Sequence, residues 1–276
     1  MNPLNEIGLV VRRELRKNLR SVKGVVLTLL SILGGTGTAA LIVQYFHRKF
    51  SQVSAEEIRI GQQELFTEIY KDPVMGSYMS TAPLSLVIML ELTIWLAPLL
   101  IALSSFDAIS GDIQHRTVRY WTVRTRRVSY YVGKFFGVWA TVSAITLAMD
   151  LCMWIVAVVK GEALGATMSW GVRFWLVSLP ISAVWCAIAT LVGSLFRTPI
   201  MALLVTLSTF FAVWLFGFAI GRGADIHWMT YIYPNRYDAM LLSPRIENAG
   251  AGLGICAGFA AMLTAAGIAL FQRRDI

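Results

Sequence analysis

Two carboxylic acids, Glu91 and Asp150, lie inside long apolar runs of the sequence. Counted along a helix at about 1.5 Å per residue, they sit roughly 10 and 14 Å from the nearer ends of those runs. Ionisable groups are costly inside a bilayer and usually face a bundle interior or a water-filled cavity. The pair therefore predicts either a pathway for a substrate or protons, or two interhelical carboxyls that only hold their helices together.

Other kinds of chemistry have few residues to carry them. The three cysteines are far apart in apolar stretches, so no disulfide framework and no Cys-x-x-Cys motif is available. The three histidines fall in separate polar loops, and the phosphate-binding, zinc-protease and serine-hydrolase motifs are missing. We expect no metal, no cofactor and no catalytic residue in this chain. An acid/base enzyme that uses Glu91 and Asp150 is an alternative, which requires the two carboxyls to be adjacent and hydrated.

The elements that must position these acids are apolar runs long enough to cross a bilayer. The 276 residues are 57% hydrophobic and 14% charged, whereas soluble domains are about 25% charged. A bilayer core needs about 20 apolar residues of helix, and six runs reach that length: Val25–Phe46, Leu84–Phe106, Phe135–Val159, Phe174–Phe196, Ile200–Ile220 and Ala249–Phe271. The sequence therefore predicts an all-α membrane protein with six transmembrane helices.

The basic residues outside these runs predict the orientation. Fifteen of the 24 Lys and Arg residues fall on the side that carries both termini, and nine fall on the other side. Because cytoplasmic loops carry the excess of Lys and Arg, both termini are predicted to be cytoplasmic. The net charge of +8 then reflects orientation and not nucleic-acid binding. A secretory signal is the alternative for the basic N-terminus, but its apolar core spans only about 7–15 residues.

Two segments outside the runs are predicted to be helical. In residues 4–22 the apolar side chains recur at spacings of three and four, which predicts an amphipathic helix along the membrane interface. The alternative is an ordinary basic flank without a surface helix. We accordingly divide the chain into an interfacial helix, 1–24, and a six-helix transmembrane domain, 25–276. The loop 107–134 also has amphipathic helical character and is predicted to dock a partner.

Short motifs in and after this loop carry a family resemblance. The sequence reads Ile-Ser-Gly-Asp at 109–112, Arg-Thr at 116–117 and Gly-Lys-Phe at 133–135. With the six spans, this resembles the permease subunits of ATP-binding-cassette (ABC) transporters of the type-2 exporter class, which have Ile-Ser-Gly-Glu, Gly-Thr and Gly-Lys-Phe. Asp112 therefore replaces the usual Glu, and Arg116 replaces the usual Gly. The C-terminal residues 271–276 also look like the ending of that family.

The resemblance implies one half of a transporter in the bacterial inner membrane. The permease domain would pair with a second copy or a related permease, among membrane lipids, and bind an ABC-type ATPase that holds ATP and Mg on the cytoplasmic face. Residues 107–127 would form the coupling helix between spans two and three. The residues assigned to ATPase coupling are Asp107, Asp112, Arg116, Thr117, Arg126 and Lys134.

Two alternatives to the transporter interpretation are open. The same fold can serve as a membrane scaffold or assembly factor that transports nothing. The charged residues of the loop can also be a solvated segment that serves only to orient the chain.

Overall fold

The computed structural model describes residues 2–49, 55–220 and 226–274, and within these ranges it contains helices and turns but no strand. In chain order the elements are α1 (Pro3–Arg20), α2 (Val22–Ser31), η1 (Ile32–Thr36), α3 (Gly37–Lys49), α4 (Ala55–Tyr70), α5 (Pro73–Met79), α6 (Leu84–Ser105), α7 (Ser110–Gln114), α8 (Val118–Arg124), α9 (Arg127–Val159), α10 (Leu164–Leu195), α11 (Pro199–Trp214), η2 (Leu215–Ile220), α13 (His227–Thr230), η3 (Pro234–Tyr237), α14 (Asp238–Leu242) and α15 (Ile246–Gln272). Short π-helical stretches, η1 and η2, continue α2 and α11.

Six helical stretches are long and apolar enough to cross a membrane, which confirms the predicted number of spans. They are Val22–Phe46, Leu84–Gln114, Arg127–Val159, Leu164–Leu195, Pro199–Phe218 and Ile246–Gln272. The third and fourth helical stretches begin two to three helical turns before the apolar runs from which these spans were predicted. Residues 127–134, which the sequence placed in a loop, are therefore helical and extend the third span.

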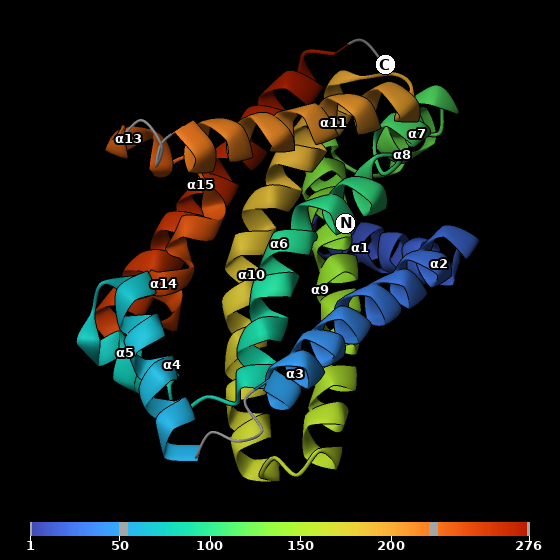
Figure 1. The fold of residues 1–276 in the computed structure, drawn as a ribbon. Helices are drawn as coiled ribbons and strands as arrows, with labels where there is room; N and C mark the ends of the chain where they lie inside the picture. Colours follow the sequence, from blue (N-terminus) through green and yellow to red (C-terminus); the bar gives the residue numbers. More distant parts are fainter. Residues whose placement is uncertain (1, 50–54, 221–225, 275–276) are drawn as a thin grey trace.

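The centre of the bundle is formed by α6, α9 and α10. Figure 1 shows these three helices side by side, with α15 inclined against α10. Two hydrogen bonds join α6 and α10 to η3 within the apolar core. The Trp185 indole N–H donates to Asn235 Oδ1 at 2.9 Å, and Asn235 Nδ2 donates to the carbonyl of Ile94 at 3.3 Å. The sharp turn that contains Asn235 is therefore fastened to α6 and α10.

Two breaks in the helices position the segments around the bundle. Ser21 has extended backbone and its hydroxyl accepts a hydrogen bond from Gly24 N–H at 3.0 Å, so it ends α1 and caps α2. This places the end of the first helix at residue 20 and not at 24. Between the second and third spans, α7 and α8 meet at a turn in which Arg116 has a φ of 57°.

Candidate functional site

A buried stripe on α1 faces α9. It consists of Glu6, Val10, Glu14 and Asn18, each at most 5% exposed. Because these residues recur every four positions, they lie on one face of the helix. The apolar residues Leu4 and Leu9 are exposed on other faces. The helix therefore buries a mostly polar face against α9. That α1 lies along the membrane interface with an apolar face stays a prediction.

Two glycines of α9 let α1 approach closely. A Cβ added to Gly133 would lie 2.6 Å from Val10 Cβ, and one added to Gly137 would lie 2.6 Å from Glu14 Cβ. Real Cβ atoms do not come this close, so any larger residue would push the helices apart. Small residues spaced four apart are a common way for membrane helices to pack at short distance. The glycine of the Gly-Lys-Phe motif therefore has a packing role.

A buried ionic cluster lies beside this contact. Lys134 Nζ on α9 is 2.6 Å from Glu14 Oε2 on α1 and 2.7 Å from Asp112 Oδ2 on α7. The side chains of Lys134 and Glu14 are 3% and 2% exposed, and that of Asp112 is 11% exposed. A buried charge is tolerated only when it is paired and hydrogen-bonded. We call Glu14, Asp112 and Lys134 the ionic junction; it ties three helices together at one point.

Neutral donors complete the surroundings of Asp112. The Tyr130 hydroxyl donates to Asp112 Oδ2 at 2.7 Å, and the Thr117 hydroxyl donates to Asp112 Oδ1 at 3.0 Å. Hydrogen bonds to a charged acceptor are stronger than neutral ones. Two carboxylates share one ammonium in the ionic junction, so these hydroxyls stabilise the charge that Lys134 does not balance. The Thr117 contact also holds the start of α8 to α7.

Three further contacts hold α1 and the start of α2 to the neighbouring loop. Asp107 pairs with Lys23, and Lys17 Nζ lies 3.7 Å from its other carboxylate oxygen. The backbone N–H of Arg126 donates to Glu6 Oε2 at 3.1 Å, and this hydrogen bond lowers the pKa of Glu6. The connection between the second and third spans is therefore attached to α1 on both sides of the ionic junction.

The structure brings together only some of the residues assigned to ATPase coupling. Asp112, Thr117 and Lys134 meet at the ionic junction, and Asp107 lies next to it with its partners on α1 and α2. Asp112 and Lys134 are buried, so they position α7 and α9 and do not form an outer surface. Arg116 and Arg126 are exposed.

Sequence reasoning did not single out Glu14 or Tyr130. The available signal for Glu14 was the spacing of Glu6, Val10, Glu14 and Asn18, which places two acids on one face of an otherwise basic helix. Tyr130 had no such signal, because its role depends on how α7 folds back beside α9. The resemblance supplied Lys134, but the sequence offered no indication that it is buried.

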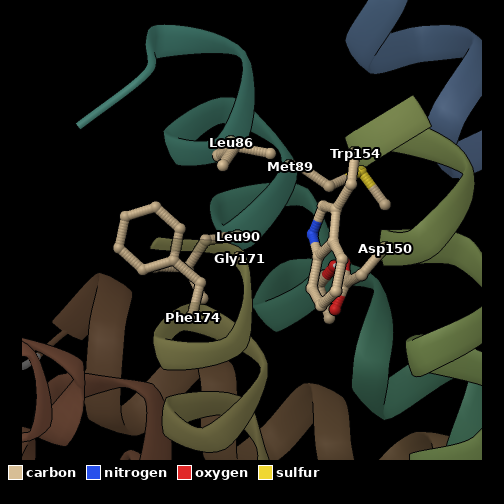
Figure 2. Close-up of a pocket in the computed structure, with 8 residues that line it drawn as sticks. Leu86, Met89, Leu90, Asp150, Trp154, Gly171 and Phe174 are labelled. Atoms are coloured by element: carbon tan, nitrogen blue, oxygen red, sulfur yellow. The ribbon is translucent and has the colours of Figure 1, made fainter. Parts of the chain in front are cut away.

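The intramembrane acid Asp150 borders a small cavity (Figure 2). The carboxyl is 6% exposed, and the Thr93 hydroxyl donates to its Oδ1 at 3.5 Å. The cavity of about 10 Å³ is lined by Leu86, Met89, Leu90, Thr93, Asp150, Trp154, Gly171 and Phe174. That volume is close to the minimum for one water molecule. The cavity can hold a hydrating water but no sizeable substrate.

Glu91 lies in different surroundings from Asp150. It is half-buried, does not line the Asp150 cavity, and interacts electrostatically with Asp238 at the start of α14. The sequence raised the possibility of an adjacent carboxyl pair for acid/base chemistry. Among the described contacts, Asp150 has a partner in Thr93 and Glu91 has a neighbour in Asp238, and none of these contacts joins the two acids.

Two comparisons with known proteins bear on the whole chain. The family model described as ABC-2 family transporter protein matches residues 9–276. No curated protein matches the chain.

Proposed function

The chain belongs to the ABC-2 family of transporter proteins, and we propose that it is the permease subunit of an ATP-driven exporter whose ATPase is a separate protein. The ATPase would hold ATP and Mg and bind at the end of the bundle that carries α7 and α8. The basic residues gathered there support a cytoplasmic location for this end and for both termini. A second copy or a related permease would complete the transporter in the bacterial inner membrane.

The observation that carries this proposal is the ionic junction. Through Asp112 and Lys134, the short helix α7 is joined directly to the third span, and through Glu14 to α1. A force applied to α7 and α8 would therefore reach α9 without a flexible intermediate. Rigid-body movement of packed helices is an established way to convert a change at one site into a change at another. The connection thus suits a coupling element.

The outer face of α8 supplies the proposed contact with the ATPase. Tyr120 and Val123 are 77% and 87% exposed, and the exposed Arg124 follows them. An apolar patch flanked by charge is typical of a protein interface. In this arrangement α8 contacts the ATPase. The residues of the ionic junction do not touch the ATPase but hold α7 and α8 in a fixed orientation on the bundle.

The test is copurification of the tagged chain from its native membrane in mild detergent, with mass spectrometry of stoichiometric partners. We expect one ABC-type ATPase per permease, and we expect Val123→Asp to remove it because a charge replaces an apolar contact. The matched control is Val159→Asp. Val159 is 80% exposed, but it lies at the C-terminal end of α9, whereas α8 precedes the N-terminal end of α9. Both variants should elute as the folded chain does.

Other outcomes would contradict the proposal. Recovery of the chain with no ATPase, or with an unrelated protein in fixed ratio, would support a scaffold or assembly factor instead. Retention of the ATPase by Val123→Asp and by a second variant, Tyr120→Ala, would show that α8 is not the contact.

A further inference from the structure

Asn235 contacts α6 at the point where this helix lacks one of its own hydrogen bonds. Residue 98 of α6 is proline, which has no backbone N–H and so cannot donate to the carbonyl four residues earlier. That carbonyl belongs to Ile94, and Asn235 Nδ2 donates to it at 3.3 Å. The side chain of Asn235 therefore supplies the donor that Pro98 removes from the helix.

The other hydrogen bonds of Asn235 hold its amide in one orientation. Its Oδ1 accepts from the Trp185 indole N–H of α10 at 2.9 Å, and its Nδ2 also donates to the Tyr233 hydroxyl at 3.0 Å. Asn235 is 7% exposed and Trp185 is 1% exposed, so both are shielded from water. Because polar groups in such surroundings are costly to leave unpaired, the amide is a specific link between α6 and α10.

The segment that carries Asn235 is attached to α10 at a second point. Arg173 Nη2 on α10 donates to the carbonyls of Leu242 and Ser243 at the end of α14, at 2.9 and 3.0 Å. Both η3 and α14 also pack against α10. These two elements are therefore fixed to α10, and the hydrogen bond from Asn235 to Ile94 ties them to α6. A movement of α6 away from α10 has to break this bond.

The helix α6 leads from this bond to the end of the bundle that is proposed to bind the ATPase. Pro98 lies about two helical turns before Ser105, where α6 ends, and α7 begins at Ser110. Prolines inside helices are the usual places where helices kink. We propose that Asn235 is a positioning residue that holds α6 against α10, and that α6 bends at Pro98 when Asn235 releases Ile94. The trigger for this release, a displacement of α7 by the ATPase, rests on the proposed function.

The first experiment measures hydrogen exchange of the α6 amides by mass spectrometry, on the full-length permease chain in detergent. Asn235→Leu removes the donor to Ile94. Asn235→Leu with Pro98→Ala also returns a backbone N–H to residue 98. The matched control is Asn235→Leu with Pro180→Ala, which changes the proline inside α10 instead.

We expect Asn235→Leu to speed exchange in peptides that cover residues 92–102 by about tenfold, since an unpaired buried acceptor shifts an equilibrium by roughly that factor. Pro98→Ala in the same chain should restore most of the slow exchange, because the alanine N–H can donate to Ile94. Pro180→Ala should restore none of it. If Asn235→Leu exchanges as the parent does, or if both proline substitutions restore exchange equally, Asn235 only fills the core and the proposal is wrong.

A second experiment needs no substitution of Asn235. The parent and Pro98→Ala, each in complex with the copurified ATPase, are compared with and without ATP and vanadate. The nucleotide should speed exchange of the same α6 peptides in the parent, and much less in Pro98→Ala, whose helix keeps its own hydrogen bond. No acceleration in the parent, or equal acceleration in both chains, would overturn the bending at Pro98. Failure to recover any ATPase would contradict only the proposed function, because the first experiment uses the permease chain by itself.

Discussion

Lys134 carries a charge that is buried in the protein, where a charged group without partners would be unfavourable. Its ammonium group is buried between Glu14 and Asp112, which belong to two other helices. The net gain from such a cluster over apolar residues is small, but removing one partner leaves the others as uncompensated buried charges. The ionic junction therefore specifies how α1, α7 and α9 meet more than it adds to stability.

Lys134→Met is expected to destabilise the chain by about 3–5 kcal/mol, because both carboxylates lose their cation. Adding Glu14→Gln and Asp112→Asn should recover part of this loss by removing the unpaired charges. Thermal unfolding in detergent measures both effects. Lys160→Met, at an exposed position after the last turn of α9, is the control and should be neutral. A Lys134→Met chain as stable as the parent would contradict the role given to the junction.

Glu6 makes the attachment of α1 depend on pH. The hydrogen bond from the Arg126 N–H lowers the pKa of this carboxyl in the folded chain, so its contribution to stability is complete above the ordinary glutamate pKa of about 4.3. It is lost as the pH falls through the lower, folded-state pKa. Comparing thermal midpoints of parent and Glu6→Gln from pH 6 to pH 3 should show a difference that shrinks at acid pH. A constant difference would mean that the carboxylate charge is not involved.

The helices illustrate which features a sequence reveals without a structure. The lengths of the apolar runs alone predicted six spans. Mean hydropathy over a whole segment indicates whether that segment lies in lipid or in water. It missed the first two turns of α9, since those turns contain Arg127 and Lys134, and hydropathy cannot register that a buried lysine is paired. The family motif directed attention to Asp112, Thr117 and Lys134. Their mutual contact, and the part played by Glu14, depend on how α1 docks on α9.

The docking of α1 on α9 is predicted to require glycine at two positions. Gly133→Ala and Gly137→Ala each improve helix propensity by about 1 kcal/mol, but the added methyl groups would meet α1 at 2.6 Å. Overpacking of this kind costs about 1–3 kcal/mol. We therefore expect lower thermal midpoints for both variants. Gly258→Ala in α15 is the control, because a Cβ there meets nothing within 4 Å, and it should be neutral or slightly stabilising.

The whole molecule has its basic residues concentrated at the end that carries both termini. This asymmetry predicts that α1 lies on the cytoplasmic side and that the α9–α10 connection lies on the opposite side. Single cysteines at Arg20 and Glu162, in a background without Cys152, Cys186 and Cys256, report the two sides. We expect a membrane-impermeant maleimide to label Glu162→Cys in spheroplasts, and Arg20→Cys only after lysis. The reverse pattern would invert the orientation and place α8 away from any cytoplasmic ATPase.

The sequence separation of the junction residues has a consequence for the synthesis of the chain. Glu14 leaves the ribosome long before Lys134, from which it is separated by 120 positions. The N-terminal helix must therefore wait, with its two buried acids unmatched, until the third span has been made and inserted. Its final docking is a late event of assembly, and a nascent chain that stops before residue 134 would leave that helix unattached and open to proteolysis.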